Sequence, residues 1–247
     1  MPDEFWSRLR RITPARIALG RVGHALPLRE VLDFQLAHAR ARDAVHATLD
    51  PDALVPELSP MRVLQVESAA HDRATYLRRP DLGRRLSARS AAVLADTGGQ
   101  CDVVFVIGDG LSATGVQARA ARLVKACASE LGDLAIGPVV IAQQARVALG
   151  DIIGEQLRAR VLVMIIGERP GLSVHDSLGI YMTFAPRTGC SDAERNCVSN
   201  IHDAGGLSPQ DAARTLGWLL REALRRQLSG VALKDDQLPL LPDRDRL

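Results

Sequence analysis

The chain has 247 residues, of which 47% are hydrophobic and 24% are charged, a balance that is ordinary for a soluble globular protein. Its formal net charge of +2 argues against nucleic-acid binding, which usually needs a concentrated basic face. The amino terminus shows no secretory signal, and the longest apolar stretch (161–166) is too short to span a membrane. The four cysteines form no C-x-x-C pair. We therefore expect free thiols in a cytoplasmic protein.

The first 60 residues differ from the remainder and are predicted to form an amino-terminal helical arm. A turn-rich basic stretch (13–23) precedes a region from Leu28 to Leu49 in which apolar residues recur at helical spacing, with arginines on the opposite face. Asp50 and Pro51 are expected to end this helix. The arm is our candidate for contact with a partner chain, although a solvated basic face explains the same pattern.

Residues 61–236 alternate between short β-type segments and helical ones, which is typical of an α/β domain. The predicted strands are 62–67, 102–107, 138–142, 161–166 and 179–185. The predicted helices are 84–95, 113–131, 147–159 and 209–228. Because the apolar runs in the strands are unbroken, we expect an open, mostly parallel, Rossmann-like sheet flanked by helices. Residues 237–247, with two prolines and four charges, are expected to form a loose tail.

Two predicted strands lead into glycine-containing loops, IGDGLSA (107–113) and IIGERPGL (165–172), which should open at the same edge of the sheet. Residues Gly108 to Ala113 fit the G-x-G-x-x-G/A pattern of a dinucleotide-binding loop, so a free-standing nucleotide-binding enzyme is the alternative function. Asp109, however, places a negative charge where phosphates would bind. The favoured role of the loop is close packing of helix on sheet, with Ser112 capping the helix that follows.

Charged and reactive residues are concentrated between 161 and 202. Glu168 follows a predicted buried strand, and is either an ordinary surface charge or a hydrogen-bond acceptor for an amide-rich ligand. Cys197 is either an inert thiol or a nucleophile that needs a base, and His202 lies five residues away. The adjacent pairs His175–Asp176 and His202–Asp203 leave a metal site as a weaker alternative.

Several motifs, taken in order, resemble the small subunit of ethanolamine ammonia-lyase. They are TPARIALGRVG (13–23), HARARDAVH (38–46), IGDGLSA (107–113), ARVALGD (145–151), IIGERPGL (165–172) and RNCVSNIH (195–202). The resemblance extends from Thr13 to about Lys234, and GERPGLS and CVSNIH in this order and spacing are highly specific to that family.

This resemblance implies a subunit of a carbon–nitrogen lyase that converts ethanolamine to acetaldehyde and ammonia with adenosylcobalamin as its cofactor. In the family, a large TIM-barrel subunit carries the substrate pocket, and the small subunit helps to enclose the corrinoid in a larger hetero-oligomer. The three cofactor-contacting positions of the family correspond to Val147, Glu168 and Cys197. The resemblance implies no catalytic residue and no metal ligand in this chain, and the isolated chain is expected to be inactive.

The resemblance also bears on the mode of cofactor binding and on cellular location. The D-x-H-x-x-G motif, whose histidine replaces the benzimidazole on cobalt in other cobalamin proteins, does not occur in the sequence, so base-on binding is expected. The loops that carry the three contact residues should converge at one edge of the sheet. Only twelve residues precede Thr13, so the long extension that is tied in some relatives to encapsulation in a bacterial microcompartment is not expected, and encapsulation is left open.

Overall fold

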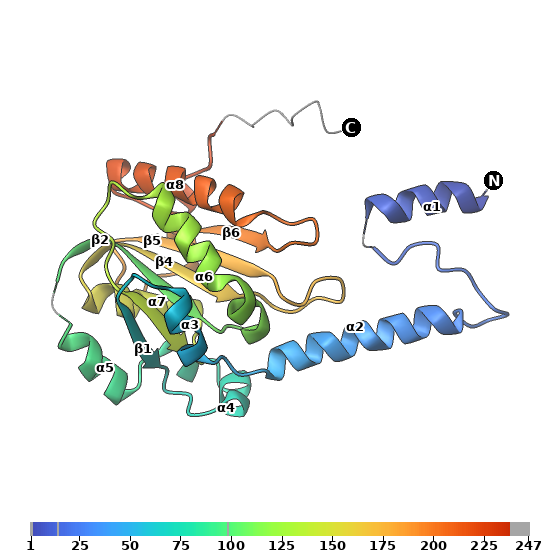
Figure 1. Cartoon of the computed structure of the whole chain (residues 1–247), viewed down its shortest axis with the longest axis horizontal. Helices are drawn as coiled ribbons and strands as arrows, with labels where there is room; N and C mark the ends of the chain where they lie inside the picture. Colours follow the sequence, from blue (N-terminus) through green and yellow to red (C-terminus); the bar gives the residue numbers. More distant parts are fainter. Residues whose placement is uncertain (1, 14, 98, 238–247) are drawn as a thin grey trace.

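The computed structural model describes residues 2–13, 15–97 and 99–237, and it contains an α/β body from which an amino-terminal arm extends (Figure 1). The strands are β1 (Val63–Glu67), β2 (Cys101–Gly108), β3 (Val139–Gln143), β4 (Ala159–Gly167), β5 (Leu178–Phe184) and β6 (Arg195–Ile201). The helices are α1 (Pro2–Ile12), α2 (Leu28–His46), α3 (Pro51–Glu57), α4 (Arg73–Arg78), α5 (Ala88–Ala95), α6 (Ala113–Glu130), α7 (Val147–Gln156) and α8 (Pro209–Arg226). Apart from Gln237, the predicted tail lies outside the described residues.

The six strands form one mixed sheet in the order β1-β3-β2-β4-β5-β6. The first four strands of this order are parallel to one another, whereas β5 is antiparallel to β4 and β6 is antiparallel to β5. Helices make the crossover connections that parallel strands require. The predicted open and mostly parallel sheet is therefore confirmed, and it carries an antiparallel pair of strands at one edge.

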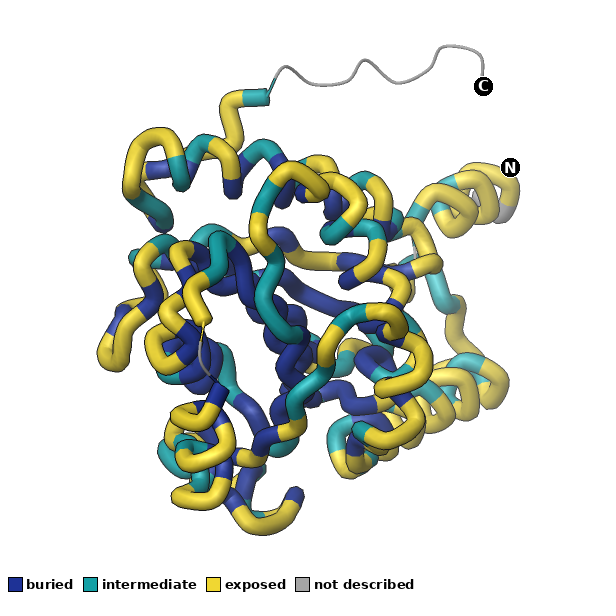
Figure 2. Tube along the Cα trace, turned by 60° about the vertical axis from the view of Figure 1, so that its left-hand side comes forward, coloured by how far each residue is buried: buried dark blue, intermediate teal, exposed yellow. Residues whose placement is uncertain are grey.

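Alternate residues of the central strands face two separate hydrophobic cores. On β2, Val103, Phe105 and Ile107 face a core shared with α3, α6 and α8, while Val104 and Val106 face a second core shared with α5 and α7. All five side chains are completely buried. Figure 2 shows these buried strands between helices whose outer sides are exposed. The unbroken apolar runs therefore do mark strands that helices cover on both faces.

Capping residues set the start of the two longest helices of the body. The Ser112 hydroxyl accepts a hydrogen bond from the Gly115 N–H at 3.2 Å, which confirms its predicted role as the cap of α6. Ser208 caps α8 in the same way, and Pro209 takes the first helical position, where an N–H group is not needed. No helix in the described part of the chain combines the length and the hydrophobicity needed to cross a membrane.

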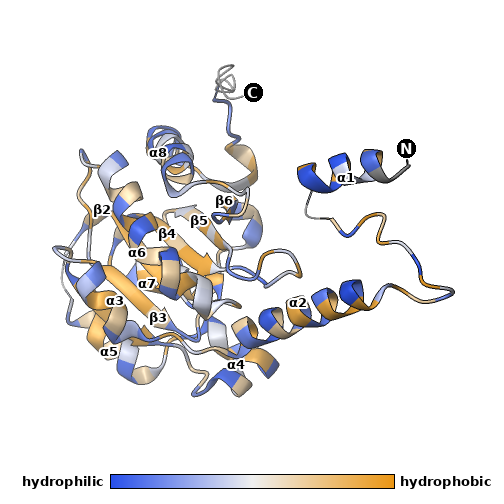
Figure 3. Cartoon of the chain, turned by 45° about the vertical axis from the view of Figure 1, so that its right-hand side comes forward, coloured by the Kyte–Doolittle hydropathy of each residue, from blue (hydrophilic) through white to orange (hydrophobic). Residues whose placement is uncertain are grey.

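The arm consists of α1, α2 and the segment between them, and it projects from the body (Figure 1). Most of its length is exposed (Figure 2), and α2 carries both hydrophobic and hydrophilic residues (Figure 3). α2 ends at His46, three residues before the predicted end, and Ala44 near this end is buried against the body. The last turns of α2 therefore join the arm to the body.

α2 ends before Asp50 and Pro51, as predicted, and these two residues also begin a second helix that was not predicted. α3 starts at Pro51, and the Asp50 carboxylate accepts hydrogen bonds from two N–H groups of its first turn. Proline at the first helical position and aspartate before it are both favourable for helix initiation. Leu54 and Leu58 are completely buried in the first core, so the body includes residues that the sequence assigns to the arm.

The secondary structure differs from the prediction at two further places. The predicted helix 84–95 is a 3-10 turn (Leu82–Arg84) followed by the shorter helix α5, which starts after the Ser87 cap. The segment 195–201, for which no strand is predicted from the sequence, is the edge strand β6. Several residues of β6 are exposed, so the strand lacks the unbroken apolar run by which the other strands are recognised.

Candidate functional site

The antiparallel edge of the sheet has one face that is not covered by a helix layer in the described chain. α7 packs on β2 and β4, whereas α6 and α8 pack on the opposite face of β5. Tyr181 of β5 belongs to the face on which α7 lies, and Cys197 of β6 is its cross-strand partner. Cys197 and Ser199 are both exposed there. We call this surface of β5 and β6, together with the neighbouring Glu168 and Val147, the open face.

Glu168 is held at the border of the open face by hydrogen bonds from Ser177, which precedes β5, and from Asn200 of β6. Its carboxylate accepts from the Ser177 hydroxyl at 2.6 Å and from the Asn200 N–H at 3.3 and 3.4 Å. Gly179 leaves the space in which this carboxylate lies, because a Cβ atom there would be 2.9 Å from Glu168 Oε1. A carboxylate offers about four acceptor positions, so Glu168 can accept further hydrogen bonds from a ligand.

His202 positions Asn200 and is not placed as a base for Cys197. Its Nδ1 accepts a hydrogen bond from the Ala204 N–H at 3.1 Å, so the ring proton of the neutral imidazole is assigned to Nε2. Nε2 can then donate to Asn200 Oδ1, which lies 2.8 Å away. Asn200 has a positive φ of 63°, and its N–H is the group that Glu168 binds. The histidine therefore supports the turn that holds Glu168.

The sulfur of Cys197 is exposed to a ligand but is not activated as a nucleophile. Desolvation by the surrounding protein raises the pKa of the Cys197 thiol, and the Tyr181 hydroxyl acts in the opposite direction to a smaller extent. Desolvation and the neighbouring Cys197 also raise the pKa of Tyr181 to about 12. Both groups are therefore protonated at neutral pH. The thiolate is the nucleophilic form of cysteine, so this environment favours a contact role.

Val147 lies on the same side of the sheet as Tyr181. It is the first residue of α7 and borders a pocket of about 380 Å³ that Tyr181 also lines. Tyr181 thus lies between Val147 and Cys197. The negative charge of Glu168 also contributes to raising the pKa of the Tyr181 hydroxyl. Val147 begins the helix predicted from 147, whereas Cys197 belongs to a strand and not to the expected loop. The structure nevertheless brings all three to one face.

Asp109 fixes the segment that leads into Val147. The carboxylate is completely buried and accepts hydrogen bonds from the N–H groups of Gln144 and Ala145, both at 2.9 Å. It also forms an ion pair with Arg73 at 3.2 Å. Sequence inspection identified the negative charge of Asp109 but not this role, because its partners lie 35 to 36 residues away along the chain.

The glycine loop after β2 packs against the loop after β4, which leaves no phosphate-binding cradle. A Cβ atom at Gly110 would overlap the Gly167 carbonyl oxygen, and a Cβ atom at Gly167 would overlap the carbonyl oxygens of Ser112 and Asp109. The Leu111 N–H also donates to the Gly167 carbonyl at 3.0 Å. The two loops do open at the same edge, as predicted, and their contact supports the packing role over the nucleotide-binding alternative.

The two His–Asp pairs are used in other contacts. Asp176 and Asp203 both form ion pairs with Arg119, at 2.7 and 3.2 Å. Within residues 2–13, 15–97 and 99–237, no three histidine, cysteine or acidic side chains lie close enough together to hold a metal ion.

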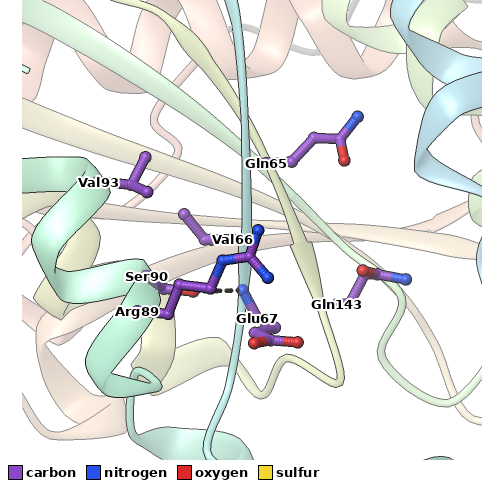
Figure 4. A pocket seen from close by; sticks show the side chains of 7 residues that line it. All are labelled: Gln65, Val66, Glu67, Arg89, Ser90, Val93 and Gln143. Atoms are coloured by element: carbon purple, nitrogen blue, oxygen red, sulfur yellow. Dashed lines mark hydrogen bonds between the residues drawn. The ribbon is translucent and has the colours of Figure 1, made fainter.

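A second pocket, of about 190 Å³, lies beside the other edge of the sheet (Figure 4). It is formed by β1 and α5, where the Ser90 hydroxyl accepts a hydrogen bond from the Glu67 N–H at 2.8 Å. Because β1 and β6 are the two edge strands, this pocket is separated from the open face by the width of the sheet. None of the residues singled out from the sequence lines it.

Comparison with known proteins gives one consistent result. A family model described as ethanolamine ammonia-lyase light chain (EutC) matches residues 3–234. The chain is 57% identical to the ethanolamine ammonia-lyase small subunit of Rhodopseudomonas palustris (strain BisA53), over 93% of this chain and 90% of that protein. It is 54% identical to the protein of the same name from Bradyrhizobium diazoefficiens, over 96% of this chain and 92% of that protein. It is 52% identical to the ethanolamine ammonia-lyase small subunit of Xanthomonas campestris pv. campestris, over 97% of this chain and 91% of that protein.

Proposed function

The chain belongs to the ethanolamine ammonia-lyase light-chain family, and from this premise we propose that its open face binds adenosylcobalamin at an interface with a large catalytic subunit. The observation that carries the proposal is the uncovered surface of β5 and β6 on which Cys197 is exposed, with Glu168 and Val147 at its borders. Tyr181, which the sequence did not single out, is a fourth contact residue in this proposal, because it lies between the other three.

The chemistry of these residues fits a corrinoid. The corrin ring is a broad apolar plate with amide side chains around its rim. The ring of Tyr181 and the side chain of Val147 offer apolar contact, and the protonated Cys197 is small and uncharged. Glu168 keeps acceptor capacity for an amide N–H group after its bonds to Ser177 and Asn200. When bound, adenosylcobalamin supplies the radical chemistry that converts ethanolamine to acetaldehyde and ammonia.

In this proposal, the role of the chain is to bind and orient the cofactor and to exclude water from it. Cys197 is a protonated thiol, and the ring nitrogens of His202 are occupied by Ala204 and Asn200, so neither is available for proton transfer. We therefore expect the isolated chain to be inactive. Base-on binding is proposed because no D-x-H-x-x-G motif offers a histidine to cobalt.

The arm is the proposed contact with the large subunit. Among the residues whose exposure the structure describes, fourteen large hydrophobic ones are exposed, and nine of them lie on the arm: Phe5, Trp6, Ile12, Val22, Leu26, Leu28, Leu32, Phe34 and Leu36. A concentration of exposed apolar side chains on one part of the chain supports an interaction site there. Residues 10–13 of the arm also border a hollow with Asn200 and His202, so the arm continues into the border of the open face. One partner could cover both surfaces, as in the large interfaces of obligate complexes.

Spectroscopic titration of the reconstituted complex tests the proposal. Adenosylcobalamin is titrated into the complex of this chain with the large subunit, and bound cofactor is followed by its absorption spectrum. Glu168→Gln, which removes the charge and replaces one acceptor oxygen with an NH₂ donor, should weaken binding about 10- to 100-fold, the effect of losing one hydrogen bond to a charged group. Cys197→Ala should also weaken binding.

Glu57→Gln is the matched control, because Glu57 is exposed on α3, outside the open face. If Glu168→Gln and Cys197→Ala both bind the cofactor as tightly as this control, the assigned contacts are wrong. If this chain alone deaminates ethanolamine, the proposed division of labour between the subunits is wrong.

A further inference from the structure

Two arginines beside the open face have no ion-pair partner among the described residues. Arg84 and Arg146 both line the pocket that contains Val147 and Tyr181. Neither guanidinium forms an ion pair or a hydrogen bond with another described residue, and the Nε atom of Arg146 is buried without a partner. A buried donor that is left unsatisfied is costly, so the arrangement favours an acceptor that reaches the pocket from outside.

The protein holds Arg146 in place before any ligand binds. Its N–H donates to the Gly83 carbonyl at 2.9 Å, and the carbonyl of the preceding Ala145 accepts from the Tyr76 hydroxyl at 3.0 Å. The guanidinium carbon lies 4.4 Å from the centre of the Tyr76 ring, which is cation–π geometry. Since Arg84 follows Gly83 directly, the contact with Gly83 also brings the two arginines close together.

The charges around the pocket leave an excess of one positive charge. Arg195 is buried, and it is paired with Asp151 and with Asp192, the latter at 2.6 Å. These three groups together carry one negative charge, and Arg84 and Arg146 add two positive charges. The amino end of α7, which begins at Val147, adds a partial positive charge at the same place. The pocket therefore suits a monoanion.

We propose that Arg84 and Arg146 form an anion-binding site that receives the phosphodiester group of the cobalamin nucleotide tail. A phosphodiester carries one negative charge, and arginine binds its oxygens with paired hydrogen bonds. Val147 lines the same pocket, so one ligand can contact it and both arginines. The identity of the anion rests on the proposed function, whereas the presence of an anion site rests on the two arginines alone.

The test compares three corrinoids that differ in the nucleotide tail. Cobalamin has the complete tail, cobinamide phosphate keeps a phosphate but no base, and cobinamide has neither. Each is titrated into the complex with the large subunit, containing wild-type chain, Arg84→Gln, Arg146→Gln or Arg146→Lys. Arg89→Gln is the matched control, because Arg89 is an exposed arginine that lines the pocket at the opposite edge of the sheet. Circular dichroism and thermal unfolding confirm that each variant is folded.

We expect Arg84→Gln and Arg146→Gln to lose on the order of 10- to 100-fold in affinity for cobalamin and for cobinamide phosphate. Arg146→Lys, which keeps the charge but not the paired geometry, should lose less. Cobinamide should bind all variants within about twofold, within the 0.5 kcal/mol expected of a neutral surface change. Inorganic phosphate should compete with cobinamide phosphate in the wild type and fail to compete in Arg146→Gln.

Three results would overturn the inference. Equal losses for cobinamide would mean that the arginines contact the ring or only stabilise the pocket. Unchanged affinity for all three corrinoids would mean that no anion binds there. Weaker association of the two subunits without cofactor would mean that the arginines pair with acidic residues of the large subunit. A wild-type complex that binds none of the corrinoids would instead refute the proposed function itself.

Discussion

The buried ion pair between Asp109 and Arg73 allows a sharp test of how the segment before Val147 is held. We predict that Asp109→Asn, which preserves shape, lowers the free energy of unfolding by about 3–5 kcal/mol, the range for breaking a buried pair by removing one partner. The Asp109 oxygens accept from the N–H groups of Gln144 and Ala145 and from Arg73. Whichever way an asparagine is turned, its NH₂ group faces an N–H donor.

Most of this loss in the free energy of unfolding comes from the Arg73 guanidinium, which the substitution leaves unpaired. Arg73 is only 7% exposed, and one of its terminal nitrogens already lacks a partner. The asparagine would leave a buried positive charge without a counter-charge. For a protein whose total stability is about 5–15 kcal/mol, the predicted loss is a large share of it. In a chain of this length it corresponds to a decrease in Tm of roughly 6–20 °C.

Unfolding of the purified chain in guanidinium chloride, followed by circular dichroism, measures this change in the free energy of unfolding. Asp43→Asn is the control, because Asp43 is exposed on α2 and should change stability by less than about 0.5 kcal/mol. The double variant with Arg73→Met should lose less than the sum of the two single variants, since it removes both charges together. A loss below about 1 kcal/mol for Asp109→Asn, or strict additivity in the double variant, would refute the reasoning.

Three further predictions concern other parts of the body. Because the pKa of the Cys197 thiol is raised, iodoacetamide should modify this thiol at pH 7 more slowly than a free thiol, and the rate should rise steeply at alkaline pH. Peptide mass spectrometry measures this rate, and rapid modification at pH 7 would contradict the prediction. Ser112→Ala should destabilise the chain by about 1 kcal/mol in thermal unfolding by removing the cap of α6, and an unchanged Tm would contradict this. Bonds from Ser191 and Arg187 lower the pKa of Glu194 to about 2, so its stabilising contribution is complete above its ordinary pKa and is lost as pH falls toward 2. The stability difference between wild type and Glu194→Gln should therefore shrink on acidification, and a difference that stays constant from pH 7 to pH 2 would contradict this.

The architecture of the body can be predicted from the sequence because it depends on local patterns. The unbroken apolar run from Val103 to Ile107 is a buried strand, and Ser112 caps the helix that follows. Strand β6 cannot be recognised by an unbroken apolar run, because Cys197 and Ser199 on the open face are exposed and only part of the strand is buried. Recognising it requires knowing that β5 is already in place as its pairing partner.

The arrangement of the site depends on contacts between residues that are distant in the chain. The hydrogen bond from the Tyr76 hydroxyl to the Ala145 carbonyl spans 69 positions, and that from the Asn200 N–H to Glu168 spans 32. No local pattern predicts such pairs. The motif containing Glu168 could be identified from the sequence, but the support that Ser177, Asn200 and His202 give it follows only from the fold.

The role of the open face in the cofactor site is best tested by titrating adenosylcobalamin into the large subunit with and without this chain, and by assaying ethanolamine deamination on the same samples. We predict tight binding and turnover only when both subunits are present, with binding weakened by Glu168→Gln and Cys197→Ala. Equal cofactor affinity and equal turnover of the large subunit alone would contradict the claim that the open face of this chain completes the cofactor site.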